Sequence, residues 1–168
     1  IEVGLYVTER ALSQVNRDNI SELQRVLEAW FESSFSSIDV CIGIGGVVET
    51  PLRTCESTVS ALSWWRDASP VARNYSDCKL LLFAETEWSE FDGRAVIGGR
   101  NAVASGIDSI DNINKKRLAF HEILHCFGLR HDDAELIHGD MYSIMHPHMG
   151  SNAQVLSSHS LRVLRGNL

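Results

Sequence analysis

Residues 121–132, HEILHCFGLRHD, hold three histidines, a glutamate and a glycine at fixed spacings, and this segment restricts the fold more than any other. On a helix, His121 and His125 are four residues apart and therefore lie on one face, one turn from each other. Gly128 follows as a residue that can adopt a left-handed conformation, end the helix and turn the chain sharply. Such a turn can return His131 to the two helical histidines. The segment therefore predicts a helix, a tight turn and three imidazoles around one point.

Three imidazoles around one point are typical of a catalytic zinc site. They leave one coordination position for water, whereas structural zinc sites are usually closed by a fourth protein ligand. Glu122, next to the first ligand, can take a proton from water that zinc activates and deliver it to a leaving amine. We therefore predict one Zn²⁺ held by His121, His125 and His131, with Glu122 as catalytic base in peptide-bond hydrolysis. The alternative, histidines without a metal, requires an accidental match at five fixed positions.

Composition limits the domain organisation and the partners of the chain. A length of 168 residues, with 44% hydrophobic and 22% charged residues, fits a single globular domain. The net charge of -7 argues against a nucleic-acid partner, which would require a basic face. No apolar run is long enough to span a bilayer. We expect one catalytic domain over residues 1–168, a monomer that acts on protein or peptide substrates without a nucleic-acid or membrane partner.

Cysteines and glycosylation motifs point to an exported protein. The chain has four cysteines without any CxxC pair, and sequons begin at Asn19 and Asn74. It starts at Ile1 rather than at a methionine. We therefore expect a secreted glycoprotein with disulfide bonds, the mature part of a zymogen whose prodomain is absent. A cytosolic protein with four free thiols is the alternative.

Hydrophobic periodicity predicts alternating strands and helices. Strands are predicted over residues 1–8, 38–48, 78–86 and within 91–99. Helices are predicted over residues 20–31, 58–67 and 113–127 and from residue 157 onward. For the first helix, Asn19 and Glu22 have the spacing of an N-cap and its capping box. The alternation indicates the α/β class, with mixed strand directions in one sheet.

The zinc segment resembles the signature HExxHxxGxxH of the metzincin metalloproteases. Asp132, directly after the third histidine, is similar to the adamalysin (reprolysin) branch of that family. SIMHP at residues 143–147 resembles the methionine turn of the same branch. By this resemblance, Met145 lies beneath the metal ligands without binding the metal, and Asp132 ties the segment after the zinc motif to this turn.

The resemblance extends more loosely over residues 63–83, 91–99 and 156–164. It implies a twisted five-stranded mixed sheet with three to four helices, an active-site cleft over the zinc helix and a substrate extended along the edge strand. A free strand edge can hold a peptide by main-chain pairing. The substrate-binding residues that the resemblance implies are Val96, Ile97, Gly98, Gly99 and Pro147.

The chain departs from the adamalysin pattern in its cysteines. Ser143 stands where a cysteine is common, and the C-terminal cysteines are absent, so the disulfides of the branch are not carried over. By sequence separation, Cys41 and Cys55 form the easiest local pair. That choice leaves Cys78 and Cys126 to link the central strand to the zinc helix, although sequence alone does not fix the connectivity.

Two other functions compete with a secreted zinc endopeptidase. A binding protein with the metzincin fold but without catalysis would have no need of Glu122, which is present. A protease of another metzincin branch is disfavoured by Asp132 and by the Ser-Ile-Met tripeptide. Many adamalysins also bind calcium, for which only Glu2 and Asn167 remain as candidates here, so no calcium site is predicted.

Overall fold

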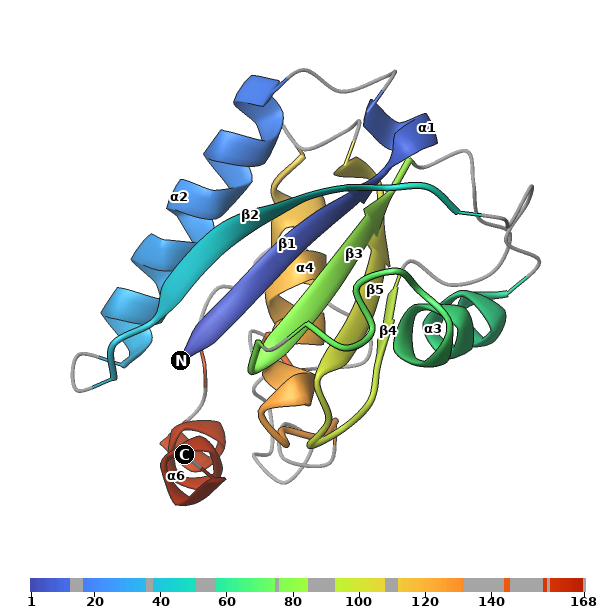
Figure 1. Cartoon of the computed structure of the whole chain (residues 1–168). Helices are drawn as coiled ribbons and strands as arrows, with labels where there is room; N and C mark the ends of the chain where they lie inside the picture. The colour runs from blue at the N-terminus through green and yellow to red at the C-terminus, as the bar shows by residue number, and fades with distance from the viewer. Residues whose placement is uncertain are drawn as a thin grey trace.

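The computed structural model describes residues 1–12, 17–35, 38–50, 57–74, 76–84, 93–107, 112–131, 144–145, 156 and 158–167. Within these residues, the chain forms strands of one sheet and helices that pack on it (Figure 1). In chain order they are β1 (Glu2–Thr8), α1 (Glu9–Leu12), α2 (Arg17–Ser34), β2 (Cys41–Val48), α3 (Thr58–Asp67), β3 (Cys78–Phe83), β4 (Gly93–Ala95), β5 (Asn101–Ser105), α4 (Ile113–Cys126) and α6 (Ser158–Asn167).

The strands form one five-stranded sheet of order β2-β1-β3-β5-β4. Strands β2, β1, β3 and β5 pair in parallel, whereas β4 runs antiparallel to β5 at the edge of the sheet. Parallel strands covered on both faces are expected to be continuous hydrophobic runs, and every residue of β3 is buried. The predicted α/β class with a mixed five-stranded sheet is therefore confirmed.

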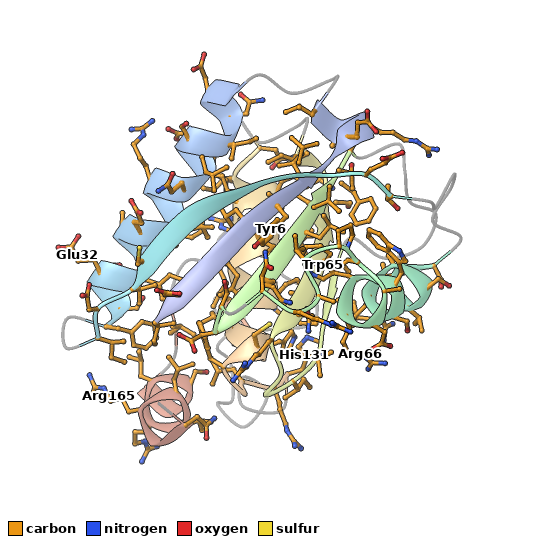
Figure 2. All side chains as sticks on the ribbon, in the orientation of Figure 1. Tyr6, Glu32, Trp65, Arg66, His131 and Arg165 are labelled. Atoms are coloured by element: carbon orange, nitrogen blue, oxygen red, sulfur yellow. The ribbon has the colours of Figure 1, made fainter. Side chains whose placement is uncertain are left out.

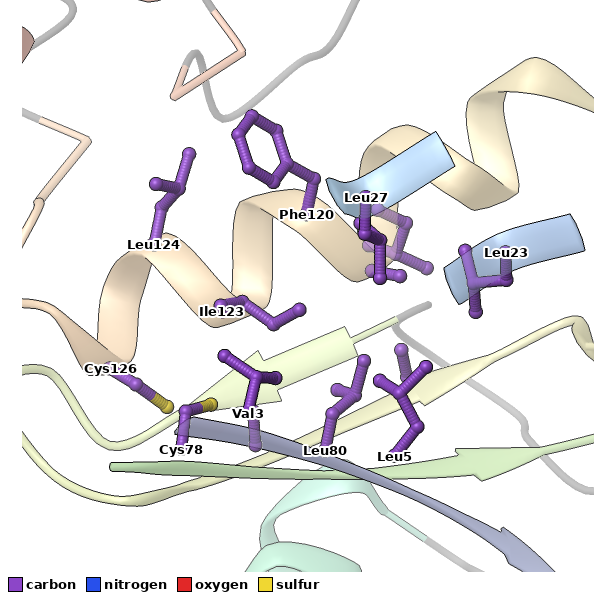
Figure 3. Packing of buried hydrophobic residues seen from close by; sticks show 14 of the residues in the cluster. Val3, Leu5, Leu23, Leu27, Cys78, Leu80, Phe120, Ile123, Leu124 and Cys126 are labelled. Carbon is purple, nitrogen blue, oxygen red and sulfur yellow. The ribbon is translucent and has the colours of Figure 1, made fainter. Parts of the chain in front are cut away.

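Helices α2 and α4 cover one face of the sheet, and α3 covers the other (Figure 1). Alternate residues of each strand face opposite sides, so Val3 and Leu5 of β1 point toward α4 together with Leu80 of β3. Figure 3 shows these side chains against Ile123 of α4 and Leu27 of α2. Helix α4, which carries the predicted ligands His121 and His125, is thus fixed by the main hydrophobic core of the protein.

The opposite face of the sheet packs on α3 through a smaller core. Tyr6 of β1 meets Trp65 of α3 edge to face, with ring centroids 5.2 Å apart (Figure 2). The indole Nε1 of Trp65 donates a hydrogen bond of 3.0 Å to the carbonyl oxygen of Lys79 in β3. Ser57 caps α3 by accepting from the Ser60 amide, and α3 spans the predicted residues. The contacts of Trp65 with Tyr6 and Lys79 join α3 to the central strands on the face of the sheet opposite α4.

The structure corrects the predicted start of the first long helix. Helix α2 begins at Arg17, so Asn19 lies in its first turn and is not the N-cap. Glu22 is not part of a capping box, since its Oε1 accepts a hydrogen bond of 3.0 Å from Lys116 Nζ of α4. Lys116 is the main cause of the lowered pKa of Glu22. Glu22, which the sequence pattern assigned to a helix cap, therefore joins α2 to α4 instead.

Strand boundaries differ most around the edge of the sheet. The predicted strand within 91–99 is only three residues long, because Gly98 has φ +66 and the Gly99 amide donates to the carbonyl oxygen of Val96 at 2.8 Å. The chain turns there into β5, a strand that the sequence analysis missed. Strand β2 likewise begins at Cys41 rather than at residue 38. No described helix is long and apolar enough to cross a membrane.

Candidate metal centre

The site is built on the C-terminal half of α4, where every side chain from Arg117 to Cys126 is buried. Asn112 caps the start of the helix by accepting from the Asn114 amide at 2.9 Å. The helix ends at Cys126, and Gly128, with φ +91, lies in the turn that follows it. There the Gly128 amide donates to the carbonyl oxygen of His125 at 2.9 Å, and the Leu129 amide donates to that of Leu124 at 3.2 Å. This turn directs the following residues back toward the helix.

The turn brings His131 to the two helical histidines, so the three imidazoles that the sequence predicted as ligands meet at one point. His131 Nε2 lies 3.0 Å from His121 Nε2 and 3.1 Å from His125 Nε2. The rings of His121 and His125 are perpendicular, with centroids 4.5 Å apart. His131 is the most exposed of the three, and Figure 2 shows it at the lower end of the sheet.

Backbone carbonyls fix the orientation of the two helical imidazoles. Nδ1 of His121 lies 2.5 Å from the carbonyl oxygen of Ile144, and Nδ1 of His125 lies 2.6 Å from that of Leu129. Because a carbonyl only accepts, each Nδ1 carries the proton and each Nε2 presents a lone pair to the centre. Burial lowers the pKa of His121 to about 3, with a further contribution from His125, so this ring is neutral near pH 7. Converging neutral nitrogen donors match the ligand set of a zinc ion.

The two carbonyls were missed by the sequence analysis, because a main-chain oxygen leaves no residue-type signal. Ile144 and the fully buried Met145 belong to the short segment that the resemblance identified as a methionine turn. The Ile144 carbonyl places this segment against the first ligand, His121. Asp132 and Pro147, the other residues predicted around this turn, lie outside the described residues.

Glu122 directly follows His121 on α4 and is buried, with 4% of its surface exposed. Burial raises the pKa of its carboxyl group to about 8, and the Arg94 guanidinium opposes this shift only in part. Among the described residues, Oε2 of Glu122 has no hydrogen-bond partner. The side chain lies against Gly93, the first residue of β4. A buried carboxyl group with an unpaired oxygen, on the helix that carries two of the candidate metal ligands, is a candidate proton acceptor.

The predicted substrate-binding residues Val96, Ile97, Gly98 and Gly99 do not form the edge strand. They lie in the turn that follows it, and the strand itself is Gly93–Ala95. The turn still contacts the site, since the Gly98 amide donates to the carbonyl oxygen of His125 at 2.9 Å. The edge strand was predicted too far along the chain, because the apolar residues and glycines after Ala95 have the composition of a strand with a bulge. Substrate binding by residues 96–99 stays a prediction.

The structure brings together two of the four predicted disulfide cysteines. Cys78 of β3 and Cys126 of α4 are buried free thiols whose sulfur atoms point toward each other (Figure 3). Burial raises the pKa of the Cys78 thiol, and its hydrogen bond to Cys126 adds to the shift. Cys126 also lines an open pocket of about 760 Å³ at the end of α4. Cys41 is an exposed thiol, and its predicted partner Cys55 lies outside the described residues.

No protein-family model matches the chain, and no curated protein matches its sequence. Solved structures do match. The chain is similar to the crystal structure of archaemetzincin from Methanopyrus kandleri, with a TM-score of 0.66 and 16% identity over 99% of this chain and 94% of that one. It is also similar to a zinc-dependent peptidase from Methanocorpusculum labreanum, with a TM-score of 0.53 and 15% identity over 96% of this chain and 99% of that one.

A third similar structure is metalloproteinase-II from Bacteroides fragilis, with a TM-score of 0.65 and 13% identity over 99% of this chain and 52% of that one. Identities this low show a common fold. The adamalysin branch in particular is not confirmed by these structures. Together with the group formed by His121, His125 and His131, the shared fold supports Zn²⁺ as the metal of this site. The chain has the fold of zinc-dependent peptidases.

Proposed function

We propose that this protein is a zinc-dependent endopeptidase that cuts extended polypeptides. The observation that carries the proposal is the group of three converging imidazole nitrogens together with the buried carboxyl group of Glu122, the residue directly after the first of them on α4. A site that only held a metal for structure would have no use for a buried carboxylate oxygen without a partner, because burying such a group costs free energy. The fold shared with zinc-dependent peptidases supports the same assignment.

In this proposal each group has a separate task. His121, His125 and His131 would hold Zn²⁺ through their Nε2 atoms, and the carbonyls of Ile144 and Leu129 keep two of the rings in the correct tautomer. The bound ion would supply Lewis-acid polarisation of the scissile carbonyl and activation of water. Glu122 accepts a proton from the attacking water at a carboxylate oxygen and then donates it to the nitrogen of the leaving amine.

Strand β4 is the proposed docking edge for the substrate. In the sheet it pairs only with β5, so the opposite edge of Gly93–Ala95 is not used by another described strand. A peptide paired to that edge would lie in an extended conformation next to Glu122. The sequence resemblance to adamalysins, through Asp132 and Met145, is our reason to propose that branch over other metzincins.

Cleavage assays with a mixture of fluorogenic peptides test the proposal. Hydrolysis is expected to stop when a zinc chelator is added and to resume when zinc is restored in slight excess. Mass spectrometry of the products is expected to locate the cuts at internal bonds, as an endopeptidase requires. A protein that binds one zinc ion but cuts neither peptides nor unfolded proteins would instead favour the non-catalytic binding protein.

We also propose that the protein is exported and that Cys78 and Cys126 form a disulfide there by exchange with an oxidised small thiol. The two sulfurs already point toward each other, and Cys126 is reachable from the pocket at the end of α4. Peptide mapping of protein made in an oxidising compartment, without reductant, is expected to find the cross-linked pair. Cys78→Ser is the matched control, and alkylation of both Cys78 and Cys126 in the wild-type protein would contradict this prediction. Glycans at Asn19 and Asn74 would appear in the same maps.

A further inference from the structure

Gly93 opens strand β4 at the point where this strand faces Glu122. A β-carbon built at Gly93 would lie 2.7 Å from Oε1, 2.8 Å from Cγ and 3.0 Å from Cδ of Glu122. Non-bonded carbon atoms pack at about 3.5–4.0 Å, so no side chain fits at position 93 while Glu122 keeps its place. The lack of a side chain at one residue therefore creates the space for the proposed catalytic carboxylate.

The backbone conformation is not the reason for a glycine here. The glycines with positive φ in the described part of the chain are Gly46, Gly98, Gly106 and Gly128, and Gly93 is not among them. An alanine can therefore adopt the backbone angles of residue 93, and the constraint is one of space alone. From the sequence, the dipeptide Asp92-Gly93 is explained as a turn, so the packing of Gly93 against Glu122 could not be predicted from it.

The packing around the side chain of Glu122 bears on where its carboxyl group lies. Its Oε2 has no hydrogen-bond partner among the described residues, so packing contributes to its position. The contact at Cγ matters most. A clash with an oxygen alone could be relieved by rotating the carboxyl group, whereas a clash with Cγ requires a change in χ1 of Glu122 or a movement of the strand.

Strand β4 is itself held from two directions. Gly93 pairs with Ala104 and Arg94 pairs with Val103 of β5, and both of these β5 residues are buried. Arg94 Nε also donates a hydrogen bond of 3.1 Å to Oγ1 of Thr58 at the start of α3. When a side chain is added at position 93, Glu122 is therefore the group that moves.

We infer that Gly93 is a positioning residue: by presenting bare backbone to Glu122, it holds the carboxylate where it can exchange a proton with the reacting water. This inference rests on the proposed peptidase function. Its first test is Gly93→Ala at a zinc content matched to wild type. We expect kcat to fall about 100-fold, the effect of a displacement near 1 Å at a reacting group, with KM unchanged. Gly43→Ala on the opposite edge strand β2 is the control, because a β-carbon there meets no atom within 4 Å.

A second readout does not depend on peptide cleavage. In protein with ¹³C-labelled glutamate, the side-chain carboxyl resonance of Glu122 is identified by its loss in Glu122→Gln. Gly93→Ala is expected to shift this resonance and to leave the other glutamates in place, whereas Gly43→Ala is expected to shift none selectively. An unmoved Glu122 resonance, an unchanged kcat, or a change confined to KM would overturn the inference.

The two readouts separate this inference from the proposed function. A shifted resonance in a protein that never cuts peptides would sustain the contact, disprove the peptidase proposal and remove the catalytic part of the inference with it. If Gly93→Ala fails to fold, the pair Gly93→Ala with Glu122→Ala decides the matter. Removal of Cγ, Cδ and the carboxylate oxygens is expected to restore folding, and a double variant that also fails would show that Glu122 is not what the side chain at position 93 meets.

Discussion

Glu122→Gln is expected to bind zinc one-to-one and to lose peptide hydrolysis by about 1000-fold in kcat, within the range for a general base or acid. Glutamine keeps the volume that packs against Gly93 but cannot accept a proton and return it. The folded structure should persist, since Oε2 of Glu122 makes no hydrogen bond to the described residues. The measurement is kcat and KM on one fluorogenic peptide, with metal content determined on the same samples.

Matched metal content decides how this result is interpreted. If the glutamine variant loses zinc, the lost activity reports on metal binding and leaves the role of Glu122 open to another test at saturating zinc. If the variant retains zinc and cuts at the wild-type rate, Glu122 is not the base, and the assignment made from its burial and its place beside His121 is wrong.

Zinc is expected to raise the thermal unfolding midpoint of the wild-type protein, and His125→Ala is expected to remove both this shift and the activity. Binding to the folded state stabilises it by about 4 kcal/mol when free zinc is about 1000 times Kd. For a chain of this size that corresponds to a shift of about 8–16 °C. Differential scanning fluorimetry of metal-free and zinc-loaded samples measures it directly.

The stabilisation has a structural cause in the position of the third ligand. His131 follows the turn at Gly128, and a shared metal would join it to the imidazoles of α4. Ile113→Ala, at an exposed position in the first turn of the same helix, is the control and should keep the full shift. A zinc-dependent shift that survives in His125→Ala would place the stabilising metal somewhere other than the three imidazoles.

The metal ligands could be predicted from sequence because their geometry is local. Two histidines four residues apart must share a face of any helix that forms, and Gly128 provides the conformation that ends it. The bounds of helix α3 could be predicted equally well, because its apolar positions and the later Pro70 define them within a few residues. In both segments the information lies within a dozen consecutive residues.

Strand β5 and the carbonyls around the ligands could not be predicted in this way. Strand β5, NAVAS, is short, and its sequence has only a weak strand pattern. It forms a strand because β3 and β4 pair with it on either side. The Ile144 carbonyl reaches His121 from 23 residues away. Gly93 shows the same limit, because the contact that requires a glycine is with a residue in another element.

One backbone hydrogen bond, from the Gly98 amide to the carbonyl of His125, has a consequence for how such an enzyme would choose its cuts. It ties the turn that follows the proposed docking edge to His125, a proposed metal ligand, through main-chain atoms alone. For a peptide paired with β4, the position of its backbone relative to the metal would then be fixed by main-chain contacts and would not depend on its side chains. Selectivity among substrate sequences would then depend on the surfaces around β4. Proteins that share this backbone arrangement could differ in specificity without a change in which bond, counted along the aligned peptide, lies at the metal.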